Sequence, residues 1–148
     1  MSYSPAQLVQ HYLTEQVSPP VGSLPPQGVV WPVYVSSMPQ DVDQCVAIYD
    51  TKGMTYGRNM RTGEKVVRPG IMVRIRAAGP EGPQGAIDFG MLIVAAFDVV
   101  KNLTFSIGNT EVTIAAISRQ GNLVFAGEEP ERQRVIYTLD AIVIATGY

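Results

Sequence analysis

The last stretch of the sequence reads GEEPERQRVIYTLDAIVIA, from Gly127 to Ala145, and joins a charged loop to an alternating segment. Because successive side chains of a β-strand point to opposite faces, the segment from Val135 to Ala145 has one wholly apolar face. Its other face carries Thr138 and Asp140, but also Ile142 and Ile144. We therefore expect a core strand whose second face is covered at one end, and another copy of the chain is a candidate for that cover.

The composition is that of one globular domain. The chain has 148 residues, of which 46% are hydrophobic and 16% charged, too apolar for wholesale disorder. The single cysteine, Cys45, lies in the apolar run QCVAIY and cannot form an internal disulfide, so we expect a buried thiol that acts as a small hydrophobe. A nucleophilic cysteine would need a histidine partner, and the one histidine, His11, lies on a polar N-terminal segment.

The sequence assigns no catalytic, cofactor-binding or metal-binding residues. One histidine and one cysteine exclude the usual zinc patterns. Glu128, Glu129 and Glu131 lie among basic residues and straddle a proline, which favours a solvated, salt-bridged loop over a metal site. The longest apolar run contains Asp98 and is too short to span a bilayer, and the N-terminus lacks the pattern of a secretory signal. We expect a protein that is made in the cytosol and has no membrane partner.

Charge is distributed unevenly along the chain. The segment from Lys52 to Arg76 holds seven basic residues against Glu64 alone, a net charge of +6. The remaining four basic and twelve acidic residues give the rest of the chain a net charge of −8. Such polarity can orient complementary contact with a partner or with a second copy of the chain.

The N-terminal part is expected to contain a short helix followed by an extended arm. Ser4, Pro5 and Gln7 form a helix start, and the helix should run to about Gln16 on the surface of the domain because its apolar side is narrow. A proline-rich arm spans residues 19–39. Its WPVYV run is either a strand edge tucked against its own core or an arm that grips a neighbour.

The middle of the chain alternates between strand and helix patterns. Cys45–Tyr49 and Ile71–Ala77 read as strands, separated by a projecting, basic loop or loose hairpin over residues 53–70. A long helix is predicted from about Gln84 to Asn102, with Met91 and Val94 on its outer side as either apolar scatter or a contact patch. Two further strands are predicted over Glu111–Ser118 and Leu123–Ala126. The apolar stripe of the helix consists of Phe89, Leu92, Ile93, Ala96, Phe97, Val100 and Leu103.

This order of elements predicts an α+β fold in a single domain over residues 1–148. We expect a mostly antiparallel sheet of about four to five strands, with one long helix and the N-terminal helix packed on it. The other face of the sheet would then present Arg74, Arg76, Thr138 and Asp140 to solvent, to a partner or to the lumen of a ring.

Taken together, the segments resemble the tail terminator or tail completion proteins of long-tailed bacteriophages, which are sometimes labelled minor capsid proteins. The resemblance covers most of the chain, from the N-terminal helix through WPVYV, CVAIYDT and RPGIMVRIRA to the long helix and the GEEPERQR loop with its last strand. The longest departures from the pattern are the proline-rich arm and the glycine-rich basic loop.

The resemblance implies a mechanical function without a reaction or a cofactor. Copies of the chain, six in number, would form a ring that caps the completed tail tube, stops its polymerisation and presents a surface to the connector or stopper protein of the head. DNA would pass through the ring without sequence-specific binding. The protein would reside in the virion, at the head–tail junction, and in the host cytoplasm before assembly.

Two charged surfaces are the predicted protein interfaces, because a head-to-tail ring needs two different complementary patches on each subunit. The first would contact the tube or a neighbour and consists of Arg58, Arg61, Lys65 and Arg68. The second consists of Glu128, Glu129, Arg132 and Arg134.

Two alternatives remain open from the sequence. Within the structural class, the chain could be a connector or stopper on the head side, or a subunit of the tail tube. In a different class, it could be a nucleic-acid-binding module that uses residues 52–76, where Tyr56 lies among basic residues. The overall pI of about 5.3 favours a protein-contact loop over the second alternative. An enzyme has the least support.

Overall fold

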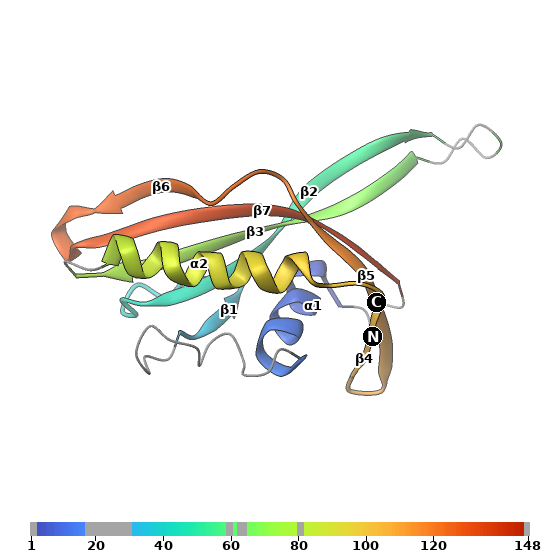
Figure 1. Ribbon diagram of the computed structural model, residues 1–148, viewed down its shortest axis with the longest axis horizontal. Helices are drawn as coiled ribbons and strands as arrows, with labels where there is room; N and C mark the ends of the chain where they lie inside the picture. Colours follow the sequence, from blue (N-terminus) through green and yellow to red (C-terminus); the bar gives the residue numbers. More distant parts are fainter. Residues whose placement is uncertain (1–2, 17–30, 59–60, 62–64, 80–81, 147–148) are drawn as a thin grey trace.

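The protein folds into a curled, mixed β-sheet with helices packed against it (Figure 1). The computed structural model describes residues 3–16, 31–58, 61, 65–79 and 82–146. The helices are α1 (Pro5–His11), which continues as a π-helical turn (Tyr12–Gln16), and α2 (Gly82–Asp98). The strands are β1 (Val33–Val35), β2 (Cys45–Arg58), β3 (Lys65–Ala78), β4 (Leu103–Ile107), β5 (Thr110–Arg119), β6 (Val124–Glu129) and β7 (Arg134–Thr146).

The sheet has the strand order β1-β2-β3-β7-β5-β4, and β6 pairs with β7 off this path. The α+β class is confirmed, but the expected four to five strands are too few. The sequence pattern missed β4, whose Leu103 was assigned to the stripe of the long helix. The sheet is also mixed, since β1 runs parallel to β2 while all other ladders are antiparallel.

The alternating segment at the end of the sequence is the central strand β7. It pairs with β3 along one edge and with β6 and then β5 along the other. Leu139, Ala141 and Val143 are buried on the face that α2 covers, as the alternation predicted. Ile142, on the opposite face, is only 3% exposed within a single chain. The predicted cover of this end is therefore present at Ile142 within a single chain, whereas Ile144 is half-buried.

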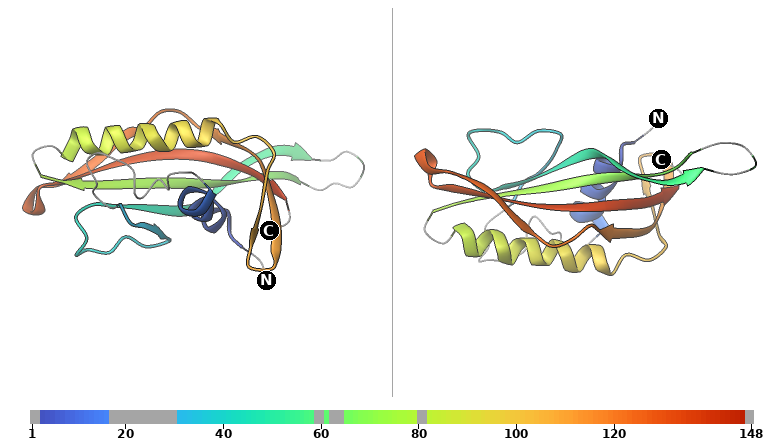
Figure 2. Two further views of the ribbon diagram at one scale, coloured as in Figure 1. Left: turned by 60° about the horizontal axis from the view of Figure 1, so that its bottom comes forward. Right: turned by 90° about the horizontal axis from the view of Figure 1, so that it is seen from above.

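The long helix α2 lies across β3, β5 and β7 (Figure 2, left). Phe89, Ile93 and Phe97 from the predicted stripe are buried in the core. The helix starts and ends earlier than predicted, because the turn at 99–102 leads directly into β4. Of the two residues interpreted as scatter, Val94 is instead buried, whereas Met91 is 54% exposed.

Helix α1 has the predicted start but not the predicted surface position. The hydroxyl of Ser4 accepts from the backbone N–H of Gln7 at 3.2 Å, and the Gln7 side chain accepts from the Ser4 N–H at 2.8 Å, which completes a capping box. Leu8, Val9 and Leu13 have no exposed surface and belong to the same core as α2. A narrow apolar stripe suffices for burial because the curled sheet partly surrounds the helix.

Trp31 resolves one alternative left open by the sequence. Its indole is buried and stacks on Phe89 of α2, with ring centroids 4.5 Å apart, and β1 follows it as an edge strand. The WPVYV run thus packs against its own core. Residues 17–30 of the proline-rich arm lie outside the described residues. No helix in the described parts of the chain is long and apolar enough to cross a membrane.

Candidate assembly surfaces

The basic segment is a projecting hairpin, one of the two forms that the sequence predicted, and its described part consists of the end of β2 and the start of β3. β3 pairs with β7 only from Gly70 onward, and β1 covers β2 only at Val46–Ile48. Beyond these points residues 54–58 and 65–68 pair, among the described residues, only with each other. This part, here called the ribbon, extends away from the body of the molecule (Figures 1 and 2). An isolated two-stranded ribbon is only marginally stable in water, so this one suits a contact with a partner.

Two glycines allow β2 and β3 to approach closely at the base of the ribbon. The register of β2 shifts between Thr51 and Met54, and Gly53 there has a φ of +68°. A Cβ added at Gly53 would lie 1.9 Å from the carbonyl oxygen of Arg68, and one at Gly70 would lie 2.3 Å from Oγ1 of Thr51. The two backbones therefore approach more closely than any larger residue allows.

Basic residues are distributed along the ribbon and at its base. Lys52 and Arg61 are exposed and Arg68 is half-buried. The remaining two predicted contact residues, Arg58 and Lys65, are register partners near the tip of the described strands. The structure thus brings the four predicted residues of the first interface onto one projecting element.

The segment 39–43 lies on the sheet face opposite α2 (Figure 2, right) and is held there by Arg76 and Arg134 from that face and by Arg132 from the 3-10 turn Pro130–Arg132. Arg76 donates from Nη2 to the carbonyl oxygens of Pro39 and Val42. Nη1 of Arg134 donates to the carbonyls of Gln40 at 2.7 Å and Val42 at 3.3 Å. Arg132 donates to the carbonyl of Gln40 at 2.7 Å. We call Arg76, Arg132 and Arg134 the arginine lock.

Two arginines of the lock, Arg76 and Arg134, are buried although the sequence analysis predicted them on the surface. Arg134 is 1% exposed and forms ion pairs with Glu129 at 2.7 Å and with Asp43 at 3.5 Å. Arg76 is also buried, so the face expected to present it to solvent is covered there by Pro39–Asp43. A buried guanidinium must keep its hydrogen-bond partners, because removing them leaves an uncompensated charge. Arg134 is thus an internal residue and not an exposed part of the second predicted surface.

The other members of the second predicted surface stay accessible. Glu128 and Arg132 are exposed, while Glu129 is half-buried through its pair with Arg134. The structure adds two exposed acids that the sequence did not single out, Asp41 and Asp43, because the lock brings their segment beside the β6–β7 turn. No local pattern could have indicated this, since the partners lie about ninety positions apart.

Cys45 begins β2 on the same face as the lock. Burial raises the pKa of its thiol, and the positive charges of Arg76 and Arg134 oppose that shift. The thiol is therefore a small buried group, as the sequence predicted. His11 stacks on Phe105 of β4, with ring centroids 5.1 Å apart, and its Nε2 is buried. Among the described residues, no group of three or more His, Cys, Asp or Glu side chains could hold a metal ion.

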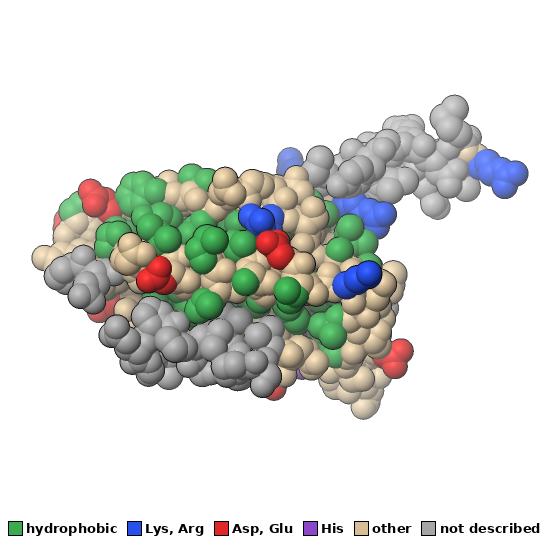
Figure 3. Space-filling view, in the orientation of Figure 1, with side chains coloured by type: hydrophobic (Ala, Val, Ile, Leu, Met, Phe, Trp, Pro, Cys, Tyr) green, Lys and Arg blue, Asp and Glu red, His purple; other side chains and the backbone are tan. Residues whose placement is uncertain are grey.

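Strand β6 and the outer side of α2 expose apolar side chains. Val124 and Phe125 are 58% and 53% exposed, and Phe125 makes an edge-on contact with Tyr137 at a centroid distance of 5.5 Å. Hydrophobic side chains gather over α2 and β6 in Figure 3. Among the described residues β6 pairs only with β7, so its outer edge is unpaired. The sequence predicted the strand but not that it would be an exposed edge.

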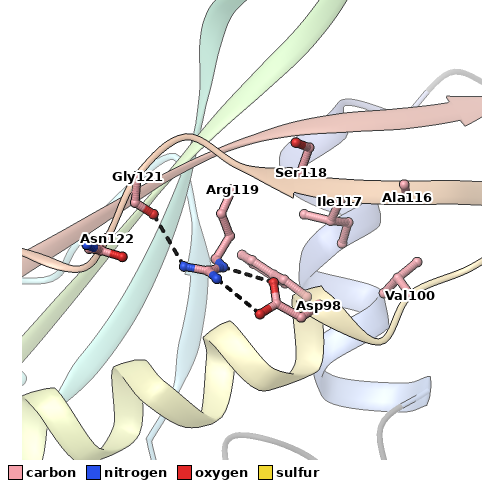
Figure 4. Close-up of a pocket in the computed structure, with 9 residues that line it drawn as sticks. Asp98, Val100, Ala116, Ile117, Ser118, Arg119, Gly121 and Asn122 are labelled. Atoms are coloured by element: carbon pink, nitrogen blue, oxygen red, sulfur yellow. Dashed lines mark hydrogen bonds and ion pairs between the residues drawn. The ribbon is translucent and has the colours of Figure 1, made fainter.

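An open groove of about 610 Å³ separates the end of α2 from β5 and the turn that follows it. The carboxylate of Asp98 pairs with the guanidinium of Arg119 through two contacts of 2.9 and 3.1 Å, and Arg119 also donates to the carbonyl of Gly121 at 3.4 Å (Figure 4). Neither partner is deeply buried. The carboxylate and the guanidinium in this groove thus satisfy one another, which is typical of a structural ion pair.

The geometry therefore defines a protein with two distinct charged surfaces and an unpaired strand edge. Comparison with known proteins identifies its family: the model described as "Bacteriophage tail terminator protein" matches residues 17–146, and the chain belongs to this family. The family is one of structural components of the phage tail, so the chain is a tail component of the virion.

Two further comparisons add less. One solved structure is similar over 95% of this chain and 97% of the compared chain, at 19% sequence identity and a TM-score of 0.48. No curated protein matches the sequence.

Proposed function

We propose that copies of this chain form a ring, a hexamer, that caps the completed tail tube, stops its polymerisation and joins the tail to the head connector. Membership of the tail terminator family supports a place in the tail. The partners are then the chain itself, the tail tube protein and the connector or stopper of the head, at the head–tail junction. DNA passes through the ring without sequence-specific contact.

The observation that carries the proposal is the position of two unlike surfaces at the two ends of the long axis of the molecule (Figures 1 and 3). The ribbon with Arg58, Arg61, Lys65 and Arg68 projects from one end. The β6–β7 turn, with Glu128 and Arg132, lies at the other. A ring built from head-to-tail contacts uses one such pair of different patches per subunit.

Electron microscopy of purified protein added to tail tubes assembled without a terminator tests the proposal. We expect a closed ring at one end of each tube, and tubes that no longer elongate when more tube protein is added. Tubes that continue to grow, with the added protein still monomeric in solution, would contradict it.

The same images separate the alternatives within the structural class. A connector or stopper on the head side would bind to completed heads and leave bare tubes free. A tube subunit would add along the whole length of the tube instead of at its end.

A nucleic-acid-binding role of residues 52–76 is the second candidate, and the ribbon favours it because a basic, projecting hairpin can follow a phosphate backbone. Arg76 is not available for it, since its guanidinium is buried and donates to Pro39 and Val42. Titration with single- and double-stranded DNA at several salt concentrations tests the role. DNA binding would be favoured by measurable affinity at physiological salt, together with a logarithm of the binding constant that falls linearly with the logarithm of the salt concentration.

A further inference from the structure

The outer edge of β6 is built to receive another strand. Its backbone groups on that side have no partner among the described residues, and Val124 and Phe125 place exposed apolar side chains on its two faces. An exposed, apolar edge strand is a template for pairing with another chain, and soluble proteins normally protect it with charge, proline or a covering element. The charges of β6 lie only at its end, at Glu128 and Glu129.

The ribbon has the complementary properties. Its residues 54–58 and 65–68 have paired inner edges and unpaired outer edges in the described part of the chain. It carries Arg58, Lys65 and Arg68, with Arg61 at its tip, whereas β6 ends in Glu128 and Glu129 and Glu131 lies in the turn that follows. Strand addition would therefore satisfy backbone groups on both elements and bring opposite charges together.

The two elements cannot meet within one chain, because they lie at opposite ends of the molecule (Figure 1). We propose that the β6 edge of one copy pairs with the β2–β3 ribbon of the next copy, so that the sheet continues from subunit to subunit. The inference rests on the ring of the proposed function, and it specifies which surfaces join neighbouring subunits. Each copy contributes one ribbon and one β6 edge, so the contact is head-to-tail and can close into a ring.

Photo-crosslinking from Phe125 tests the pairing. Phe125 is replaced by p-benzoyl-phenylalanine, which exchanges one exposed aromatic side chain for another. Equal amounts of isotope-labelled and unlabelled protein are then mixed with terminator-free tail tubes. We expect mixed-isotope cross-links between position 125 of one copy and residues 52–70 of the other. The matched control carries the same group at Val99, which is 74% exposed but follows the end of α2. We expect no cross-links from Val99 to residues 52–70.

A second pair of variants tests the edge without a cross-linker. Val124→Lys combined with Phe125→Lys should raise the protein concentration needed for half-maximal ring assembly by about tenfold or more, since edge lysines oppose strand pairing. Val99→Lys should leave that concentration unchanged. Thermal unfolding of all variants shows whether they are folded, and both exposed sites should tolerate lysine.

The outcomes separate this inference from the proposed function. Rings at tube ends whose cross-links from position 125 reach another segment of the neighbour, or the tube protein, would overturn the pairing and leave the cap intact. Rings that still form at tube ends in the variant with both lysine substitutions would likewise overturn the pairing and leave the cap intact. Cross-links to residues 52–70 in protein that assembles without affinity for tubes would support the pairing and contradict the cap.

Discussion

The two ends of this molecule use arginine in opposite ways. At the end with the β6–β7 turn, Arg134 is buried and its two terminal guanidinium nitrogens contact two backbone carbonyls and two carboxylates of its own chain. At the other end, Arg58 and Arg68 belong to a ribbon that has no third strand among the described residues, and Arg61 lies near its tip. The comparison teaches that a charge count along the sequence does not separate arginines that hold the fold from those on a projecting element.

The largest expected effect comes from breaking the lock. Arg134→Met should lower the free energy of unfolding by roughly 3–4 kcal/mol, because it breaks the ion pair of the buried guanidinium with Glu129 and removes one of the two arginine donors to each of the Gln40 and Val42 carbonyls. Urea unfolding measures the change. The control is Arg132→Met, which removes one exposed hydrogen bond and should cost under about 1 kcal/mol. Equal losses in both variants would show that burial does not distinguish them.

The same substitution should expose Cys45. In the native protein the raised pKa of the thiol keeps the thiolate fraction low at mildly alkaline pH, and burial limits access, so a thiol reagent should react far more slowly than in urea. Arg134→Met should accelerate labelling by loosening Pro39–Asp43, whereas Arg132→Met should not. Native labelling as fast as in urea would mean that the segment does not protect the thiol.

The base of the ribbon gives the next largest effect. Gly53→Ala should destabilise the protein by roughly 2–3 kcal/mol, because the residue has a positive φ and its Cβ would overlap the carbonyl of Arg68. Gly108→Ala is the matched control, with a φ of +59° and only the Tyr3 hydroxyl at 3.5 Å, and should cost about 1 kcal/mol. Thermal unfolding compares the two, and equal costs would mean that the ribbon shifts freely to accept a side chain.

Charge reversal on the ribbon should affect assembly more than stability. Arg61→Glu combined with Arg68→Glu should change the free energy of unfolding by about 1 kcal/mol or less, since neither residue is buried. Ring formation on tail tubes should require about tenfold more protein. Glu128→Lys combined with Glu131→Lys in the same chain should restore part of the loss. Unchanged assembly in the first variant would remove the ribbon from the proposed interfaces.

The smallest effect should come from the groove between α2 and β5. Asp98→Asn removes an exposed ion pair with Arg119 and should cost about 0.5 kcal/mol, less in high salt. Urea unfolding at low and high salt measures both values. A loss as large as that of Arg134→Met would contradict the distinction between exposed and buried arginines.

Much of the fold could be predicted because it depends on local periodicity. The capping box at Ser4 and Gln7, the apolar stripe of α2 and the apolar face of β7 all depend on residues a few positions apart. Strand β4 was missed since a short apolar segment directly after a helix continues the helical period. The exposed edge at Val124 and Phe125 could not be predicted either, because an alternating strand reads alike at the edge and in the centre of a sheet.

The sequence by itself determined the α+β class, the central alternating strand and the separation of a basic segment from an acidic remainder. Only the tertiary structure decided which charges stay on the surface. Arg76 and Arg134 are internal because Pro39–Asp43 folds over them. The basic segment projects because the part of β3 before Gly70 does not pair with β7. Periodicity is set by neighbouring residues, whereas burial of a charge depends on backbone carbonyls that come from distant parts of the chain.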